Sequence, residues 1–193
     1  MFNKLTFVAS AYSIKELPKG KLPMVILCGR SNVGKSSFIN SFFQNKIAKT
    51  SSTPGKTRSI NYYMVDDRFF IVDLPGYGYA KTSQKEREYW GKLISDFLDF
   101  ALPDIVFAFH LIDSRHKPTT LDEAMKNMLE KKNIEYKILL SKSDKLNQAE
   151  LAKTKKEIKL FAPYLKYNEN LVLYSAVKNT GRKEVANLLK VFY

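Results

Sequence analysis

At 193 residues, with 45% hydrophobic and 13% aromatic side chains and no low-complexity linker, the chain is expected to form one packed domain over 1–193, with 1–22 as an N-terminal extension. Its single cysteine, Cys28, excludes an intramolecular disulfide, and no apolar run approaches a membrane span, so we expect a cytoplasmic protein. The 32 Lys and Arg exceed the 19 Asp and Glu by a net charge of +13, which favours polyanionic partners such as nucleic acid or an anionic membrane surface.

Segments of strand type alternate with segments of helical spacing from the N-terminus onward. We expect a strand or arm over 6–14, a strand over 24–28 and a helix beginning near Lys35, followed by a basic loop over 44–59. Strands over 61–65 and 69–74 are joined closely enough for an antiparallel hairpin, and Thr82 is the expected N-cap of the next helix. The apolar positions expected to face inward on these two helices are Phe38, Ile39 and Phe42, and Tyr89, Leu93, Phe97 and Phe100.

The second half of the chain continues this alternation. A nearly all-apolar strand over 105–112 ends in Asp113, and strands over 136–140 and 170–175 alternate with helices over 121–132, 151–161 and 183–192. The first of these helices is expected to face inward with Leu121, Met125, Met128 and Leu129. Such alternation predicts a mostly parallel sheet covered by helices on both faces, in which ligands bind at the carboxyl ends of the strands.

The segment Gly29-Arg-Ser-Asn-Val-Gly34-Lys35-Ser36 directly follows the strand over 24–28 and fits the P-loop pattern. Its glycines let the backbone curl so that successive N–H groups face phosphate oxygens, and the following helix adds its positive end. Lys35 is placed to reach the β- and γ-phosphates, and Ser36 to place its hydroxyl on Mg²⁺. A chance Gly-rich turn before Lys-Ser is the alternative, and the strand before it and the helix after it argue against that alternative.

A second polar segment, Asp73-Leu-Pro-Gly76, ends the second strand of the hairpin. An aspartate at this position can hold Mg²⁺ through a water, and the N–H of Gly76 can reach the γ-phosphate. The same four residues also form routine turns. The segment is informative because it follows a P-loop.

A third polar segment, Ser141-Lys142-Ser143-Asp144, follows the strand over 136–140. The Asp144 carboxylate can accept hydrogen bonds from the N1–H and 2-amino groups of guanine, a donor pair that adenine lacks, while the Lys142 stem lies over the base. Ser175-Ala176 can offer a backbone N–H to the guanine carbonyl oxygen. Taken alone, the segment 141–144 is as well explained as the N-cap of the following helix.

Two stretches concentrate the positive charge. The stretch 44–60 contains no acid, and 153–159 contains only Glu157; their basic residues are Lys46, Lys49, Lys56 and Arg58, and Lys153, Lys155, Lys156 and Lys159. An ordinary solvated helix face is the favoured explanation of the second stretch when it is considered in isolation.

Together, these motifs resemble the EngB/YihA/YsxC family of bacterial ribosome-assembly GTPases, of the TRAFAC class and its TrmE-Era-EngA-EngB-Septin-like group. The resemblance covers essentially the full length, and its most specific pieces lie at 29–37, 53–58, 73–78 and 113–116. It implies a three-layer α/β fold of the P-loop GTPase (Ras-like) type, with a mostly parallel six-stranded sheet, one antiparallel edge strand and helices on both faces.

The resemblance also implies ligands and site residues. GTP or GDP and Mg²⁺ are the expected ligands, with Ser36, Thr57 and Asp73 on the metal and with Lys35, Thr57, Gly76 and Asn32 as the catalytic set. Thr57 would report the γ-phosphate by ordering its loop. The expected nucleotide-binding residues are Gly29, Arg30, Ser31, Asn32, Val33, Gly34, Lys35, Ser36, Ser37, Gly55, Lys56, Thr57, Arg58, Ser59, Asp73, Leu74, Pro75, Gly76, Ser141, Lys142, Ser143, Asp144, Tyr174, Ser175 and Ala176.

The chain departs from the pattern at two positions. Ser141 replaces the usual Asn or Thr of the guanine motif, from which we expect weaker bracing of that loop. Tyr77 stands where GTPases such as Ras have a water-orienting Gln, so hydrolysis is expected to be slow without a partner or to use another group. Asn32 with a bound K⁺ and Arg58 are the two candidates, and a comparison of turnover in K⁺ and Na⁺ buffers tests the first.

The remaining candidates have structural explanations at hand. We expect His110 to be a satisfied core residue, His116 to stabilise its loop by a hydrogen bond, and Trp90 to be buried. Tyr77 and Tyr79, which flank Gly78, are expected to be exposed, where they can stack on RNA bases or contact a protein partner.

The leading interpretation is a slow GTPase that acts as a switch in assembly of the large ribosomal subunit, through rRNA and ribosomal proteins. By resemblance it is linked to cell division and septation, and we expect a monomer that does not contact membranes. An RNA-binding scaffold module in which nucleotide is mainly structural is the alternative, and Tyr77 is the residue that favours it. An ATP-using P-loop enzyme is a third interpretation, against which Asp144 argues.

Overall fold

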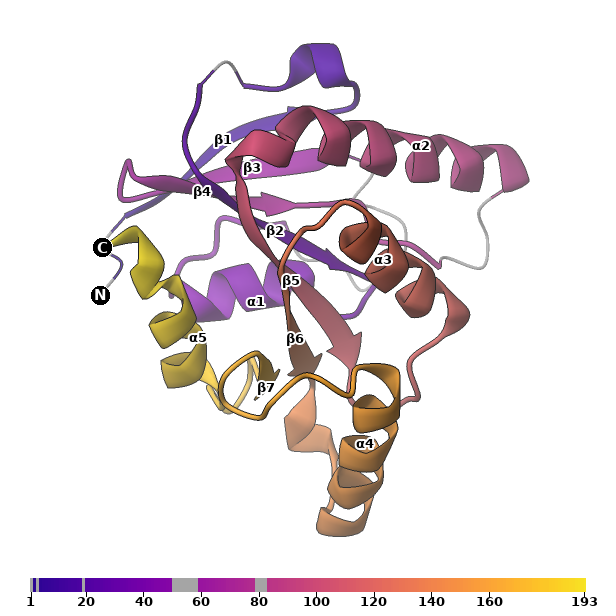
Figure 1. Cartoon of the computed structure of the whole chain (residues 1–193). Helices are drawn as coiled ribbons and strands as arrows, with labels where there is room; N and C mark the ends of the chain where they lie inside the picture. Colours follow the sequence, from indigo (N-terminus) through magenta and orange to yellow (C-terminus); the bar gives the residue numbers. More distant parts are fainter. Residues whose placement is uncertain (1, 3, 19, 50–58, 79–82) are drawn as a thin grey trace.

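The computed structural model describes residues 2, 4–18, 20–49, 59–78 and 83–193 (Figure 1). Its strands form one seven-stranded sheet in the order β1-β3-β4-β2-β5-β6-β7. The strands are β1 Leu5–Ala11, β2 Met24–Gly29, β3 Ile60–Val65, β4 Phe69–Asp73, β5 Ile105–Asp113, β6 Tyr136–Ser141 and β7 Leu171–Leu173. The helices are α1 Lys35–Phe42, α2 Gln84–Ala101, α3 Thr120–Lys131, α4 Gln148–Phe161 and α5 Arg182–Leu188, with 3-10 turns at Ile14–Glu16, Leu102–Asp104, Ser143–Lys145 and Leu189–Phe192.

The sheet has one strand more than the six expected, because β1 joins it. β1 pairs antiparallel with β3 from Leu5↔Val65 to Ala11↔Ile60, so the stretch assigned to an N-terminal extension forms the edge of the sheet. β3 is antiparallel to β4 as well, whereas β4, β2, β5, β6 and β7 pair in parallel. The sequence did not decide between a strand and an arm for this stretch. Phe7 and Val8 are neighbouring apolar residues, both exposed in mid-strand, so apolar and polar side chains do not alternate cleanly.

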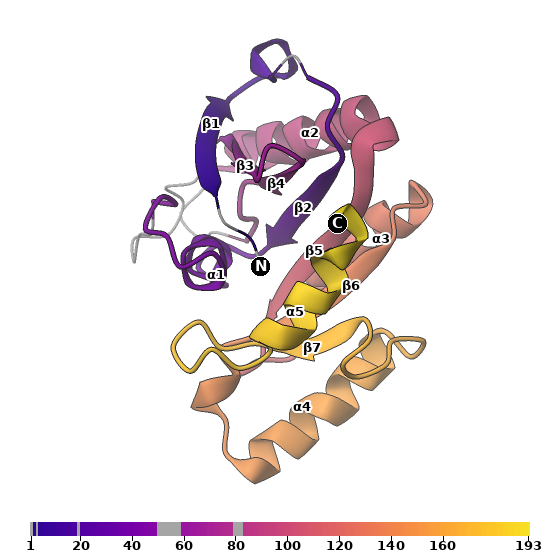
Figure 2. The same ribbon diagram turned by 90° about the vertical axis from the view of Figure 1, so that its left-hand side faces the viewer.

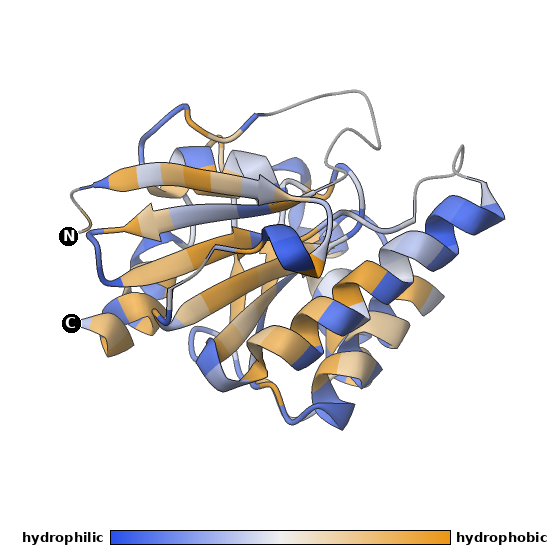
Figure 3. Cartoon of the chain, turned by 90° about the horizontal axis from the view of Figure 1, so that it is seen from above, coloured by the Kyte–Doolittle hydropathy of each residue, from blue (hydrophilic) through white to orange (hydrophobic). Residues whose placement is uncertain are grey.

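Helices cover both faces of the sheet, as predicted (Figures 1 and 2). On one face, α2, α3 and α4 bury Phe97, Leu129 and Ile158 against the strands, and on the other α1 and α5 bury Phe38 and Val185. In Figure 3 the strands carry mostly hydrophobic colours, whereas α2 alternates between hydrophobic and hydrophilic positions, as a helix with one face on a sheet must. None of the described helices is long and apolar enough to cross a membrane.

Two helix faces differ from the prediction. Leu93 and Phe97 are buried, but Tyr89, Phe100 and, on α3, Leu121 are 51%, 60% and 44% exposed. A spacing of four residues drifts by about 40° per step against the helical repeat, so an i, i+4, i+8 series leaves the buried face. The buried positions of α2 are instead Leu93, Ile94, Phe97, Leu98 and Ala101.

The start of α2 and the C-terminal elements also differ from the predicted bounds. Ser83 is the N-cap of α2 and forms a capping box with Glu86, whereas the predicted cap, Thr82, lies outside the described residues. The last strand spans only Leu171–Leu173, and the final helix changes to a 3-10 turn after Leu188.

The register of the parallel strands brings the polar strand ends to one edge of the sheet. Leu27 of β2 lies beside Asp73, Gly29 beside Leu111 of β5, and Asp113 beside Ser141. The predicted phosphate loop and the segments that follow β4, β5 and β6 therefore meet at the carboxyl ends of the strands, where ligands bind in open α/β sheets.

Candidate functional site

The predicted P-loop connects β2 directly to α1. A Cβ atom at Gly29 would lie 2.6 Å from the carbonyl oxygen of Leu111, so this position admits no side chain. Asn32 and Gly34 have positive φ angles of 61° and 113°, which curl the chain just before α1 begins at Lys35. The curl leads into a helix N-terminus whose first N–H groups have no partner within the helix, as anion binding requires.

Beside this loop, Lys35, Ser36 and Asp73 form a cluster of buried and half-buried polar groups. The Lys35 Nζ lies 3.9 Å from Asp73 Oδ1 and donates to the Gly29 carbonyl at 3.5 Å, while the Ser36 hydroxyl donates to Asp73 Oδ2 at 3.3 Å. Asp73 Oδ1 is buried and has no hydrogen-bond partner among the residues that the structure describes. Burial raises the pKa of the Asp73 carboxyl, and Lys35 and Ser36 oppose that rise. A hydroxyl and a carboxylate oxygen that lacks a partner are donors that Mg²⁺ accepts, so these residues fit the metal.

Gly76 lies directly against the P-loop. A Cβ atom there would be 2.8 Å from Ser31 Cα, 2.9 Å from Ser31 N and 3.2 Å from Lys35 Nζ. The next residue continues the contact, because the Ser31 N–H donates to the Tyr77 carbonyl at 2.7 Å. The segment after β4 is thus packed onto the phosphate loop at a distance that only glycine permits.

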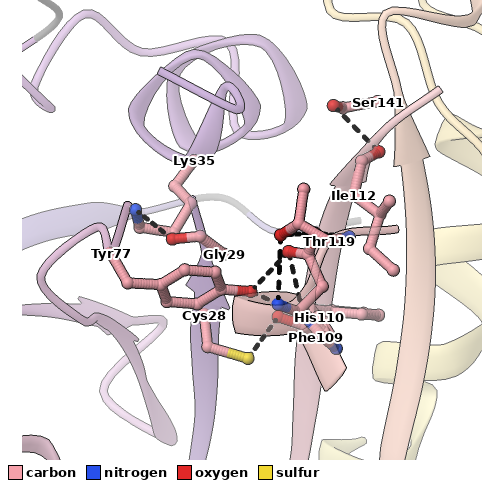
Figure 4. Close-up of polar contacts among 10 residues, drawn as sticks. Cys28, Gly29, Lys35, Tyr77, Phe109, His110, Ile112, Thr119 and Ser141 are labelled. Atoms are coloured by element: carbon pink, nitrogen blue, oxygen red, sulfur yellow. Dashed lines mark hydrogen bonds and ion pairs between the residues drawn. The ribbon is translucent and has the colours of Figure 1, made fainter. Parts of the chain in front are cut away.

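The prediction of an exposed Tyr77 is wrong. The side chain is partly buried, and its hydroxyl donates to Asp122 Oδ1 at 2.8 Å and lies 2.8 Å from His110 Nε2. Figure 4 shows the ring reaching from its loop toward His110 and Thr119. Burial raises the pKa of Tyr77 well above its usual range, so the phenol stays protonated. His110 of β5 and Asp122 of α3 supply these contacts, which join segments far apart in the sequence and which no sequence pattern predicted.

His110 is buried, as predicted, but only one of its ring nitrogens has a hydrogen-bond partner within the described residues. Because the Tyr77 hydroxyl proton goes to Asp122, the Nε2 of His110 must carry a proton and donate it to the phenol oxygen. Nδ1 has no partner. Burial lowers the pKa of His110 to about 4, with Asp122 opposing and Lys126 adding to that shift.

We expect the protein to lose stability as the pH falls from 6.5, the ordinary value for histidine, toward 4. In that window the unfolded state binds a proton at His110 that the folded state excludes, so the free energy of unfolding falls by up to about 1.4 kcal/mol per pH unit. Urea unfolding at several pH values, for the wild type and for His110→Phe, measures this. The variant should show a shallower slope over the window, and identical slopes would contradict the assignment.

The predicted guanine-binding segments also meet. The Ser175 hydroxyl donates to Asp144 Oδ1 at 2.7 Å and lowers the pKa of that carboxyl, while the Val177 and Lys178 N–H groups donate to the Ser175 oxygen. The Lys142 Nζ donates to the Asn32 carbonyl at 2.8 Å and so connects this segment to the P-loop. The helix-cap alternative is excluded, because Asn147 is the N-cap of α4.

Asp113, which the sequence singled out only as part of a motif, holds Lys142 in place. Its carboxylate accepts from Lys142 Nζ at 2.8 Å and from Arg115 Nη2 at 2.8 Å. Burial alone would raise the pKa of Asp113, but the hydrogen bonds from Arg115 and Lys142 outweigh burial and hold it well below its usual range. The position of Asp113 at a strand end was the available signal, and its partners depend on strand register.

Ser141 braces the loop despite the substitution, because its hydroxyl donates to the Val33 carbonyl at 2.8 Å. Tyr174 is buried, and its hydroxyl lies 2.7 Å from that of Ser41, on the side of α1. The Ser59 hydroxyl donates to the Asn61 side chain, and no contact within the described residues joins this hydroxyl to the P-loop. The predicted residues Gly55, Lys56, Thr57, Arg58 and Tyr79 lie outside the described residues.

Cys28, His116 and Trp90 lie outside this cluster of site residues. Cys28 is buried, and burial raises the pKa of its thiol to about 12, as for an unreactive core residue. The His116 N–H donates to the Asp113 carbonyl, a bond that stabilises the loop through its backbone rather than its ring. Trp90 is only partly buried, against the core of the α2 face.

Comparisons with known proteins agree with this geometry. The family described as "50S ribosome-binding GTPase" matches residues 24–142. A "Probable GTP-binding protein EngB" from Thermoanaerobacter pseudethanolicus is 40% identical over 189 residues, covering 96% of each chain. The protein of the same name from Petrotoga mobilis is 43% identical and covers 94% of this chain and 92% of its own.

Solved structures show the same fold. A crystal structure titled as a probable GTP-binding protein engB has a TM-score of 0.74 at 21% identity and covers 88% of this chain and 98% of its own. Era in complex with MgGDPNP and nucleotides 1506–1542 of 16S ribosomal RNA has a TM-score of 0.68 at 22% identity and covers 90% of this chain and 57% of its own. With a P-loop, an Asp-Leu-Pro-Gly segment packed on it and a Lys-Ser-Asp segment hydrogen-bonded to the P-loop, the chain belongs to the EngB family of GTP-binding proteins and is a GTPase.

Proposed function

We propose that the protein is a GTP-dependent switch in assembly of the large ribosomal subunit: it binds the maturing particle with GTP and leaves it after hydrolysis. The observation that carries this proposal is the contact of Gly76 with Ser31 and Lys35, because it places the backbone of Gly76 beside the phosphate loop, where a γ-phosphate would lie. A donor that reaches the γ-phosphate gives GTP a contact that GDP lacks, and this difference between the two complexes is what a switch requires.

Within this proposal the nucleotide is held by residues 29–37, and its base is read by Asp144 with Lys142. Ser36, Thr57 and Asp73 hold Mg²⁺, which supplies positive charge to the phosphate oxygens when bound. The support is the Asp73 Oδ1 atom, which is buried, faces Lys35 and accepts no hydrogen bond from the described part of the chain. Lys35 neutralises charge that develops on the transferred phosphate, and the Gly76 N–H donates to the same group.

The attacking water is not oriented by a side chain at position 77, because the Tyr77 hydroxyl is engaged by Asp122 and His110. Hydrolysis is therefore slow unless another group completes the site. Asn32 with a bound K⁺, and Arg58, are the two hypotheses for the group that completes the site. A cytoplasmic location, a monomeric state and the link to cell division and septation likewise stay predictions from the family resemblance.

The contact with the particle is proposed to lie on the solvent face of α4. Its lysines Lys153, Lys156 and Lys159 are exposed, and none forms an ion pair with the residues that the structure describes. Both acids of the helix are engaged elsewhere, Glu150 in the capping box at Asn147 and Glu157 with Lys117 at 3.7 Å. The outward face is thus basic without an intervening acid, which fits the phosphate backbone of RNA.

Reversing these three charges, Lys153→Glu, Lys156→Glu and Lys159→Glu, is expected to weaken association with large ribosomal subunits by about tenfold or more at near-physiological salt. It should also reduce the dependence of affinity on salt, because fewer counterions are released. Co-sedimentation over a salt series measures both quantities.

The matched control reverses Lys15, Lys21 and Lys190, which are exposed on other parts of the surface and change the net charge equally. Equal weakening by both triple variants would mean that net charge alone drives association. No weakening by the α4 variant would place the contact elsewhere.

A further inference from the structure

Tyr77 joins two parts of the molecule through opposite ends of one residue. Its carbonyl accepts the Ser31 N–H at 2.7 Å, directly after the glycine that packs on the P-loop. Its hydroxyl reaches Asp122 in the first turn of α3 and His110 in the middle of β5, each at 2.8 Å. The residue that follows Gly76 is therefore held at both its backbone and its side chain.

Asp122 offers one carboxylate oxygen to the Tyr77 hydroxyl. Asp122 is 2% exposed, and its Oδ2 is already occupied by the Thr119 N–H and hydroxyl, both at 2.7 Å. Among the described residues, the Tyr77 hydroxyl is the hydrogen-bond donor to Oδ1. If the Tyr77 hydroxyl moved away, Oδ1 of the buried Asp122 would lose this hydrogen bond, which is costly in a low-dielectric interior.

His110 completes the arrangement from the other side. It is fully buried, its Nε2–H donates to the phenol oxygen, and Phe161 of α4 packs on its ring at 6.3 Å between centroids. The chain of donors runs from His110 to Tyr77 to Asp122, and each proton has one defined acceptor. This fixes the direction of the Tyr77 ring, and with it the backbone that carries Gly76.

We propose that Asp122 and His110 are positioning residues for the γ-phosphate contact of Gly76, acting through the hydroxyl of Tyr77. They hold the segment after β4 on the P-loop, so that the Gly76 N–H is in place before the nucleotide arrives and no free energy of binding is used to order it. The inference rests on the proposed role of Gly76 as the γ-phosphate contact.

The hold of Asp122 and His110 on Tyr77 affects the affinities for GTP and GDP unequally. GTP gains the contact with Gly76, whereas GDP has no γ-phosphate to receive it. Loosening the hold on Tyr77 therefore lowers the affinity for GTP and leaves the affinity for GDP nearly unchanged. The ratio of the two affinities is a quantity that a purely structural role of Tyr77 would not move.

The test measures binding of GDP and of a non-hydrolysable GTP analogue to the full chain carrying Tyr77→Phe. We expect the affinity for the analogue to fall about tenfold, the equivalent of one net hydrogen bond, with GDP affected less than about twofold. His110→Phe, which removes only the donor to the phenol oxygen, should lower the ratio in the same direction by less. Asp122→Asn replaces one carboxylate oxygen by an NH2 group, so Thr119 and the Tyr77 hydroxyl must share one acceptor oxygen, and the ratio should fall in the same direction.

Tyr136→Phe is the matched control, because it removes a phenol that donates to Glu130 at 2.8 Å at the opposite end of β6. It should leave the ratio unchanged. An unchanged ratio in Tyr77→Phe, a tighter analogue complex or an equal fall for both nucleotides would overturn the proposal. If Tyr77→Phe does not fold, His110→Phe is judged by the same criteria. A wild-type protein that binds both nucleotides equally would instead refute the proposed role of Gly76 itself.

Discussion

The Asp144→Asn protein is expected to prefer XTP to GTP. In the proposed site the Asp144 carboxylate accepts from two donors of guanine, the N1–H and the 2-amino group, whereas xanthine carries a carbonyl oxygen at position 2. The Asn Oδ1 can still accept the Ser175 hydroxyl that now reaches Asp144 at 2.7 Å, which leaves the amide NH₂ for the xanthine oxygen. Loss of two hydrogen bonds to a charged group corresponds to about a thousandfold lower affinity for GTP.

Competition between labelled GTP and unlabelled XTP or ATP measures this preference. Asp96→Asn is a suitable control, since it removes an exposed carboxylate on α2 that pairs with Lys92 one turn away. The control should bind GTP as the wild type does. Undiminished GTP affinity in Asp144→Asn would contradict the guanine assignment, and strong competition by ATP against the wild type would favour an ATP-using protein.

Gly76→Ala is expected to abolish the response to the γ-phosphate. The added methyl group would lie 2.8 Å from Ser31 Cα and 2.9 Å from Ser31 N, and these are backbone atoms that cannot move aside as a side chain would. The segment must therefore leave the P-loop, and its N–H goes with it. Loss of a preorganised donor to the transferred group typically costs about a hundredfold in rate, so hydrolysis should fall by about that factor while GDP still binds.

Gly91→Ala is the matched control for this substitution. Apart from its two chain neighbours and the backbone of its own helix, no atom of the described residues lies within 4 Å of a Cβ added at Gly91, which sits inside α2, so alanine there should leave hydrolysis unchanged. It should also stabilise the helix slightly, by up to about 1 kcal/mol. Wild-type turnover by Gly76→Ala would show that the contact seen between Gly76 and Ser31 has no part in hydrolysis.

The phosphate loop and the strand-end segments were predictable because they depend on local chemistry. Gly29, Lys35 and Asp73 each occupy a position that strand, turn and helix rules define over a few residues. The parallel order of the strands then brings these positions together without further information. The assignment of guanine rather than adenine rests on Asp144. Its neighbour Ser175 was also among the site residues predicted from the sequence.

What escaped prediction depends on contacts between distant segments. The inward direction of Tyr77 requires Asp122 and His110, which are supplied by α3 and β5. A Thr-x-x-Asp pattern at Thr119 predicts a capping box with Asp122, but it does not predict that the second carboxylate oxygen of Asp122 accepts from the Tyr77 hydroxyl. The added edge strand β1 likewise depends on pairing with β3, and pairing at an edge leaves little trace in periodicity.

The most direct test of a nucleotide-dependent switch is co-sedimentation of the protein with purified ribosomal subunits at near-physiological salt, with GDP or with a non-hydrolysable GTP analogue. Salt must be controlled, because a chain with a net charge of +13 binds rRNA non-specifically at low ionic strength. We predict binding to the large subunit with the GTP analogue, little binding with GDP, and loss of the difference in Gly76→Ala. Equal binding with both nucleotides would contradict the switch and favour an RNA-binding scaffold in which nucleotide is mainly structural.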